Sequence, residues 1–203
     1  SAGLRDRTIL ALGGSIKTCE LAREYGLASH LAGGTHHAHR DRGSGFCIYN
    51  DLAVSARYLV NQGLASRVLI FDCDVHQGDG TASILAHDTQ VFTCSIHAEK
   101  NFPVRKAESD LDVNCPDGMT DDDYLALVFE TLESLIAGWY PDFVIYDAGS
   151  DVHVDDAEIT GTDEFIEHII TVMEAEFGKL KIEEGDFTNC GVEWHQQADY
   201  IEL

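Results

Sequence analysis

The feature that most constrains the fold is a short apolar run that ends in a cluster of ionisable residues. Residues 68–71 are all apolar, and residues 71–80 read Phe-Asp-Cys-Asp-Val-His-Gln-Gly-Asp-Gly. An apolar run with this boundary is typical of a buried strand in a parallel sheet. Ligands of such sheets bind just beyond the carboxyl ends of the strands. The sequence therefore predicts a functional site at the end of this strand.

Three side chains of this run, Asp72, Asp74 and His76, share one face if the strand stays extended. Ionisable groups packed together at a buried strand end are costly unless a cation compensates them. Asp74 and His76, with Asp151 as the third ligand, supply two carboxylates and an imidazole. This set suits a divalent cation and leaves one position open for water or substrate. The alternative is that these acids only cap helices. The complete run over 71–80 favours the metal site.

Strand and helix patterns alternate along the first 150 residues. Apolar stripes with capping residues predict helices over 8–25, 51–62 and 120–136. Apolar runs predict strands at 67–72, 91–96 and 142–147. This order predicts an α/β fold with a mostly parallel sheet covered by helices. All three strands end in polar residues, so one edge of the sheet is expected to carry the site.

Composition excludes several classes of protein. The chain has 203 residues, of which 44% are hydrophobic, and no apolar run approaches the length of a membrane span. The net charge of −23 argues against direct binding to nucleic acid and favours cationic partners, including lysine-rich peptides. The six cysteines form no Cys-x-x-Cys pair, which predicts reduced thiols in an intracellular protein of the nucleus or cytoplasm.

The acidic charge is unevenly distributed. Residues 151–203 contain 15 acidic residues and two lysines, a net charge of −13, so the first 150 residues carry the remaining −10. This shift predicts a domain over residues 1–156 and an acidic, divergent tail over 157–203. Apolar spacing after Thr162 predicts one amphipathic helix over 162–177 in that tail.

A second motif lies in a loop rich in glycine and histidine. Residues 33–37 read Gly-Gly-Thr-His-His, and two glycines let the backbone approach a ligand closely. Adjacent loop histidines are more often surface residues than catalysts. Here, however, acids at positions 72 and 79 are available to orient an imidazole. The loop aromatics of residues 45–47 (Gly-Phe-Cys) and 101–103 (Asn-Phe-Pro) indicate only core packing when taken alone.

Four segments together resemble the zinc-dependent histone deacetylase family. They are residues 33–38 (Gly-Gly-Thr-His-His-Ala), 45–51 (Gly-Phe-Cys-Ile-Tyr-Asn-Asp), 71–80 and 146–151 (Tyr-Asp-Ala-Gly-Ser-Asp). The chain is most similar to the class IV and bacterial deacetylase-like branch. The resemblance implies an arginase/deacetylase-like α/β fold, expected to be incomplete at both ends, and hydrolysis of an acetylated lysine peptide or another acylated amine. The arginase branch, with another signature and two metals, is disfavoured.

The resemblance also implies roles for individual residues. Asp74, His76 and Asp151 would bind Zn²⁺, which would polarise the amide carbonyl and activate water. His37 would act as general base and then acid, oriented by Asp79. His36, paired with Asp72, would assist electrostatically. Asp72 and Ser95 would form a structural K⁺ site. Gly45, Phe46 and Phe102 would form the substrate channel.

The tyrosine that stabilises the oxyanion in this family has no counterpart here. The chain contains no Gly-Gly-Tyr, and Tyr200 lacks the neighbouring glycines. Losing one oxyanion donor typically costs about 10²–10³ in turnover. Two hypotheses therefore remain open: a zinc-dependent deacetylase, and a non-catalytic pseudo-deacetylase that binds zinc and acyl-lysine or serves as a structural or interaction module. Turnover of an acetyl-lysine peptide distinguishes them.

Overall fold

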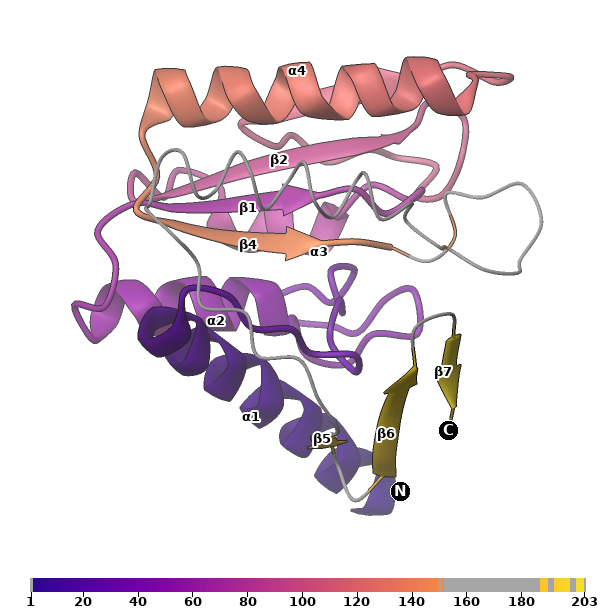
Figure 1. Ribbon diagram of the computed structural model, residues 1–203. Coiled ribbons are helices and arrows are strands. Elements are labelled where there is room, and N and C mark those ends of the chain that lie inside the picture. The colour runs from indigo at the N-terminus through magenta and orange to yellow at the C-terminus, as the bar shows by residue number, and fades with distance from the viewer. Residues whose placement is uncertain (1, 150, 152–186, 190–191, 198–199, 203) are drawn as a thin grey trace.

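A four-stranded parallel sheet forms the centre of the computed structural model, which describes residues 2–149, 151, 187–189, 192–197 and 200–202 (Figure 1). The strand order is β3-β2-β1-β4, and every pair of neighbours runs parallel. The prediction of a mostly parallel sheet flanked by helices is confirmed. The strands are β1 (Val68–Asp72), β2 (Val91–Ala98), β3 (Leu111–Cys115) and β4 (Phe143–Asp147).

Helices cover both faces of this sheet, as Figure 1 shows. Alternate residues of β1 face opposite sides, so Val68 and Ile70 join one hydrophobic cluster and Leu69 and Phe71 join the other. The first cluster includes residues of three helices, and the second is closed by the fourth. Burial on both faces explains the continuous apolar run of β1. The helices are α1 (Ala2–Tyr25), α2 (Asp51–Asn61), α3 (Asp79–Leu85) and, on the second face, α4 (Asp121–Trp139).

The predicted helices are present, with shifted ends. The side chain of Asn50 caps α2 by accepting a hydrogen bond from the backbone of Ala53, and Thr120 caps α4 in the same way. The helix expected from residue 8 starts at residue 2, and its predicted apolar stripe is only partly buried. Ile9 is 50% exposed, whereas Cys19 packs into the cluster with α2.

Within residues 2–149 two elements were not predicted, and the three strands after residue 186 were not predicted either. In β3, polar side chains interrupt the sequence Leu-Asp-Val-Asn-Cys, and every residue is at least partly exposed. A half-exposed edge strand of this kind has no continuous apolar run to reveal it. The seven-residue α3 begins inside the 71–80 motif, at Asp79, where the glycines on either side favour a loop.

The C-terminal segment contains a separate antiparallel sheet in the order β5-β6-β7. Its strands are β5 (Phe187–Asn189), β6 (Val192–Gln197) and β7 (Tyr200–Glu202). The amphipathic helix predicted over 162–177 lies outside the described residues, and the division at residue 156 stays a prediction. In the part of the chain that the structure describes, no helix is long and apolar enough to cross a membrane, and five cysteines are free thiols.

Candidate active site

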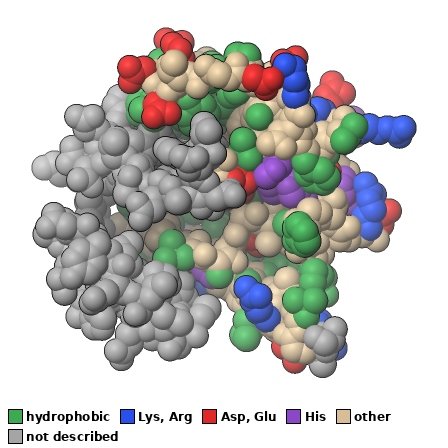
Figure 2. Space-filling model, turned by 90° about the vertical axis from the view of Figure 1, so that its right-hand side faces the viewer, with side chains coloured by type: hydrophobic (Ala, Val, Ile, Leu, Met, Phe, Trp, Pro, Cys, Tyr) green, Lys and Arg blue, Asp and Glu red, His purple; other side chains and the backbone are tan. Residues whose placement is uncertain are grey.

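The carboxyl ends of three neighbouring strands bring polar side chains to one edge of the sheet. Asp72, the last residue of β1, is the register partner of Ser95 in β2 and of Asp147 in β4. The loops that follow β1 and β4 add acidic residues and a histidine beside these strand ends. Figure 2 views this edge, where histidine side chains reach the surface between hydrophobic ones.

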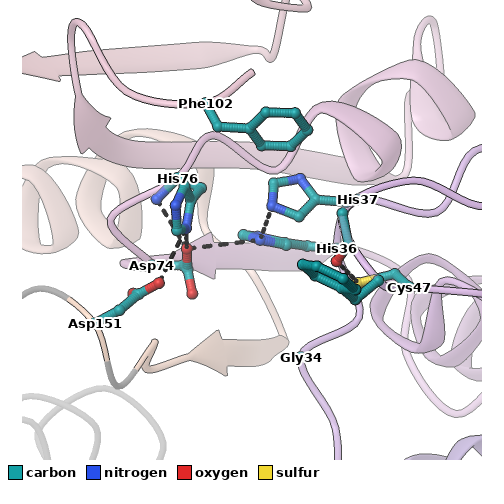
Figure 3. Close-up of a pocket in the computed structure, with 10 residues that line it drawn as sticks. Gly34, His36, His37, Cys47, Asp74, His76, Phe102 and Asp151 are labelled. Atoms are coloured by element: carbon teal, nitrogen blue, oxygen red, sulfur yellow. Dashed lines mark hydrogen bonds and ion pairs between the residues drawn. The ribbon is translucent and has the colours of Figure 1, made fainter. Parts of the chain in front are cut away.

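Asp74, His76 and Asp151 form the outer cluster of this edge. The Nδ1 atom of His76 lies 3.0 Å from Asp74 Oδ1 and 3.0 Å from Asp151 Oδ2. One ligand atom from each residue lies within 4.8 Å of the other two, and all three residues are half-buried (Figure 3). Two carboxylate oxygens and one imidazole nitrogen at this spacing fit a divalent cation and leave room for a further ligand.

Asp72 does not share a face with this cluster, as an extended strand would require. The strand ends at Asp72, whose Oδ1 accepts a hydrogen bond of 3.0 Å from the backbone N–H of Asp74. Asp74 in turn accepts a bond of 2.8 Å from the backbone of His76. These successive aspartate turns bend the chain away from the strand direction. The conditional prediction of one extended face is wrong, and Asp72 faces the histidine loop instead.

His36 and His37 are both buried, and each is paired with its own carboxylate. His36 Nδ1 lies 2.7 Å from Asp72 Oδ2, and His37 Nδ1 lies 2.7 Å from Asp79 Oδ1. The two Nε2 atoms face each other at 3.1 Å, and His36 Nε2 lies 3.6 Å from Asp74 Oδ1 (Figure 3). His36 Nε2 therefore lies between His37 and the outer cluster.

The charge state of His36 follows from its surroundings. Burial by itself lowers the pKa of His36, but the hydrogen bond and charge of Asp72, with the charges of Asp74 and Asp147, outweigh it and raise this pKa to about 9. A protonated His36 donates from Nδ1 to Asp72 and from Nε2 to His37. His37 in turn donates from its Nδ1 to Asp79.

Asp147 belongs to the site, although the sequence singled out only its position at the end of a strand. Its Oδ2 lies 3.8 Å from His36 Nδ1, is buried and has no hydrogen-bond partner among the described residues. Burial, followed by the negative charge of Asp72, raises the pKa of Asp147 well above its usual range. His36, Asp72 and Asp147 thus form an inner cluster whose surroundings favour the protonated form of Asp147.

A pocket of about 400 Å³ opens beside the two clusters. The ring of Phe102 stands edge-on to His37, with centroids 4.9 Å apart, and Phe46 is fully exposed with a φ of 62°. Gly45 has a φ of +50°, and a Cβ there would collide with the His37 ring. The residues expected to form the channel all line this pocket, which consists of Gly34, His36, His37, Gly45, Phe46, Cys47, Asp74, His76, Phe102 and Asp151.

Three supporting residues escaped the sequence analysis. Asn50 donates to the carbonyls of His36 and Ala38 at 3.0 and 3.2 Å, and Asp51 accepts the backbone N–H of Thr35 at 2.8 Å. Both lie in the 45–51 motif, which was the only signal available. His39, to which no role was assigned, lies 3.1 Å from Asp79 through its Nε2. These contacts fix the backbone and the carboxylate around the tandem histidines.

The predicted K⁺ site stays a prediction. Asp72 and Ser95 are register partners in neighbouring strands. Within the described residues, Ser95 Oγ contacts His97 Nδ1 at 3.0 Å and the backbone N–H of Gly78 at 3.4 Å. Both Asp72 oxygens accept protein hydrogen bonds, and each keeps a further lone pair.

Comparisons with known proteins agree with this arrangement. A family model described as histone deacetylase domain matches residues 1–200. An uncharacterized protein of Picosynechococcus is 55% identical over 156 residues, which cover 77% of this chain and 52% of that protein. Histone deacetylase 2 of Arabidopsis thaliana is 34% identical over 144 residues, which cover 70% of this chain and 37% of that protein. A crystal structure of an HDAC homolog complexed with SAHA has a TM-score of 0.71 at 27% identity, and the match covers 86% of this chain and 50% of that one.

The chain therefore spans about half the length, or less, of the curated relatives it matches. Its parallel sheet flanked by helices is the arginase/deacetylase α/β fold, in agreement with the structural similarity. The family model covers nearly all of the 203 residues, and it includes the four motifs that build the site. The chain belongs to the histone deacetylase family.

Proposed function

We propose that this chain carries the active site of a zinc-dependent deacetylase that hydrolyses the amide of acetyl-lysine in histones or other proteins. One observation carries the proposal: two imidazoles, each paired with its own carboxylate, lie beside a cluster of one histidine and two aspartates, at a pocket lined by two phenylalanines. General base, electrostatic partner, metal ligands and substrate channel thus meet at one edge of the sheet.

The outer cluster supports zinc as the metal of this site. Its three ligand atoms come from one imidazole and two carboxylates and leave a position open, which is the pattern of catalytic rather than structural zinc. When bound, zinc would polarise the amide carbonyl and lower the pKa of a water molecule. Structural K⁺ at Asp72 and Ser95 is part of the same proposal and rests on the family resemblance.

The two histidines would divide the proton chemistry. The Nδ1–H of His37 donates to Asp79, which leaves Nε2 as the basic atom of the ring. Once released from its 3.1 Å contact with His36 Nε2, this atom would accept a proton from the attacking water. The same atom would then return the proton to the leaving lysine amine. His36 would supply positive charge near the reacting carbonyl, since Asp72 holds it in place. Asp79 acts by fixing the tautomer of His37.

The pocket walls suit a lysine side chain. Phe46 and Phe102 would contact the methylene groups of the lysine stem, and the carbonyl would lie near His76 at the bottom. The homolog that binds SAHA supports binding of an acylated amine at this pocket. An intracellular location, nuclear or cytoplasmic, belongs to the proposal and is supported by the free thiols among the described cysteines.

A non-catalytic pseudo-deacetylase is the second candidate, since the clusters and the pocket alone would also serve to bind zinc and acyl-lysine. Such a protein would keep the zinc cluster and bind acyl-lysine without hydrolysing it. The experiment compares turnover of an acetyl-lysine peptide, with and without chelator, for the protein and for His37→Ala. Chelator-sensitive turnover that His37→Ala loses supports the enzyme. One equivalent of zinc without turnover supports the binding module, and a protein that binds no zinc contradicts both.

A further inference from the structure

His39 is a mostly buried histidine beside the site, and the proposed chemistry does not use it. Its side chain is 9% exposed, and its Nε2 lies 3.1 Å from Asp79 Oδ2. The other oxygen of the same carboxylate, Oδ1, lies 2.7 Å from His37 Nδ1. Asp79 is therefore held between two imidazoles, one on each oxygen, and it is itself 7% exposed.

The surroundings of His39 fix which of its nitrogens carries the proton. Nδ1 is buried and has no hydrogen-bond partner among the described residues, so a proton there would be unsatisfied. An ionised carboxylate only accepts hydrogen bonds, so Nε2 donates to Asp79. The backbone N–H of His39 donates to the carbonyl of Arg42 at 2.9 Å and anchors the residue in a turn. His39 is thus a fixed donor aimed at the carboxylate.

The two histidine–aspartate pairs differ in how the second carboxylate oxygen is held. Asp72 receives its second hydrogen bond from the backbone of Asp74, so no side chain is needed. Asp79 receives it from His39, which is a side chain that can be exchanged by mutation. Burial alone would raise the pKa of Asp79, but the bonds and charges of His37 and His39 outweigh it, and the pKa is lowered.

We propose that His39 is a positioning residue for His37, acting through Asp79 in a chain His37–Asp79–His39. With donors on both oxygens, the carboxylate cannot rotate, and Oδ1 stays in line with the Nδ1 proton of His37. This inference rests on the proposed function, because it assumes that His37 is the general base. His39 does not line the pocket, so it affects turnover rather than substrate binding.

The first test compares His39→Leu with His39→Gln. The amide nitrogen of glutamine has a reach similar to that of imidazole Nε2 and keeps a donor for Asp79, whereas leucine keeps only volume. We expect His39→Leu to lose about tenfold in kcat with unchanged KM and zinc content, as is typical for partners of catalytic groups. His39→Gln is expected to stay within about threefold of the wild type. In an Asp79→Asn background, His39→Leu should cause no further loss.

The second test needs no turnover. The proton between His37 Nδ1 and Asp79 Oδ1 takes part in a short, charge-assisted hydrogen bond and should resonate far downfield in ¹H NMR. This resonance is assigned by its loss in Asp79→Asn. We expect it to persist in His39→Gln and to shift or vanish in His39→Leu. Tyr58→Phe, which removes a 2.6 Å bond to Glu20 between α1 and α2, is the matched control and should leave both readouts unchanged.

The outcomes separate this inference from the proposed function. If the wild type shows no turnover but the resonance responds to His39→Leu as expected, the deacetylase proposal fails while the positioning of His37 stands. If kcat and the resonance of His39→Leu both equal those of the wild type, the positioning role is refuted. Equal losses in His39→Leu and His39→Gln, accompanied by lower thermal stability, would show a merely structural role and also overturn it.

Discussion

Two clusters of the same composition, each with one histidine and two aspartates, lie next to each other at the carboxyl edge of the sheet. All three residues of the outer cluster, Asp74, His76 and Asp151, line the pocket. Of the inner cluster, only His36 does so, while Asp72 and Asp147 lie deeper. The clusters come within 3.6 Å of each other, between His36 Nε2 and Asp74 Oδ1.

The difference in burial between the two clusters shows that residue type alone does not decide whether a group of histidine and aspartates binds a metal or holds protons. In the outer cluster, partial exposure leaves both carboxylates able to carry their charge to a cation. In the inner cluster, Asp72 is hydrogen-bonded to His36, and burial beside Asp72 raises the pKa of Asp147 and so favours its protonated form. We therefore assign the metal to the outer cluster and protons to the inner one.

Replacing the two inner aspartates should give the largest contrast in stability. Asp72→Asn removes the charged partner of a buried imidazolium, which typically costs about 3–5 kcal/mol. Asp147→Asn replaces a neutral acid by a neutral amide of the same shape and should change the free energy of unfolding by about 1 kcal/mol or less. Urea unfolding of both variants measures the difference. Equal losses would contradict a neutral Asp147.

The pH dependence of stability tests the charge on His36. The ordinary pKa is 6.5 and the raised one is about 9, so His36 stabilises the metal-free protein fully below pH 6.5 and loses this contribution as the pH rises through 9. The loss amounts to roughly 3 kcal/mol. Asp147 acts in the same direction, because its raised pKa also favours the protonated form.

This pH effect is measured by urea unfolding of the metal-free protein on both sides of that range, with His36→Asn as the control. The free energy of unfolding should fall much less with rising pH in His36→Asn than in the wild type, although Asp147 still contributes to the fall. A wild-type protein whose stability does not fall between these pH values would show that His36 is not held in its charged form.

A matched pair of glycine substitutions gives the smallest expected effects. Gly34 has a φ of +80°, and an added Cβ would lie 2.7 Å from Asp147 Oδ1. Gly149 has a φ of +55°, and its Cβ would meet the backbone of Asp74. Each change to Ala should cost about 1–2 kcal/mol from the left-handed backbone alone. Zinc titration should show weaker binding for Gly149→Ala only. Weaker binding for Gly34→Ala instead would reverse the assignment of the two clusters.

The sequence predicted the outer cluster better than the inner one. Asp74, His76 and Asp151 belong to specific motifs, and the loops that carry them follow predicted strands. The role of Asp147 could not be predicted from the sequence. Its raised pKa results from burial beside Asp72, and only the register of β1 and β4 brings the two residues together. His39 escaped for a similar reason, since its contact with Asp79 depends on the turn closed by Arg42.

The fold shows the same limit. Fully buried β1 was predicted from its apolar run, and α4 from its cap at Thr120. The half-exposed β3 lacks a continuous apolar run, because its side chains alternate between the cluster under α4 and the opposite, polar face, and its five residues give only a short alternating pattern. Patterns that arise from burial on both faces are visible in a sequence, whereas positions set by neighbouring strands are not.

Calorimetric titration of the metal-free protein with Zn²⁺ tests the central assignment most directly. We predict that the wild type and Asp147→Asn each bind one equivalent of zinc. In Asp151→Asn the zinc affinity should fall by more than about 100-fold, which exceeds the loss typical of residues that only contact a metal ligand. Loss of binding in Asp147→Asn together with normal binding in Asp151→Asn would place the metal in the inner cluster and contradict the account.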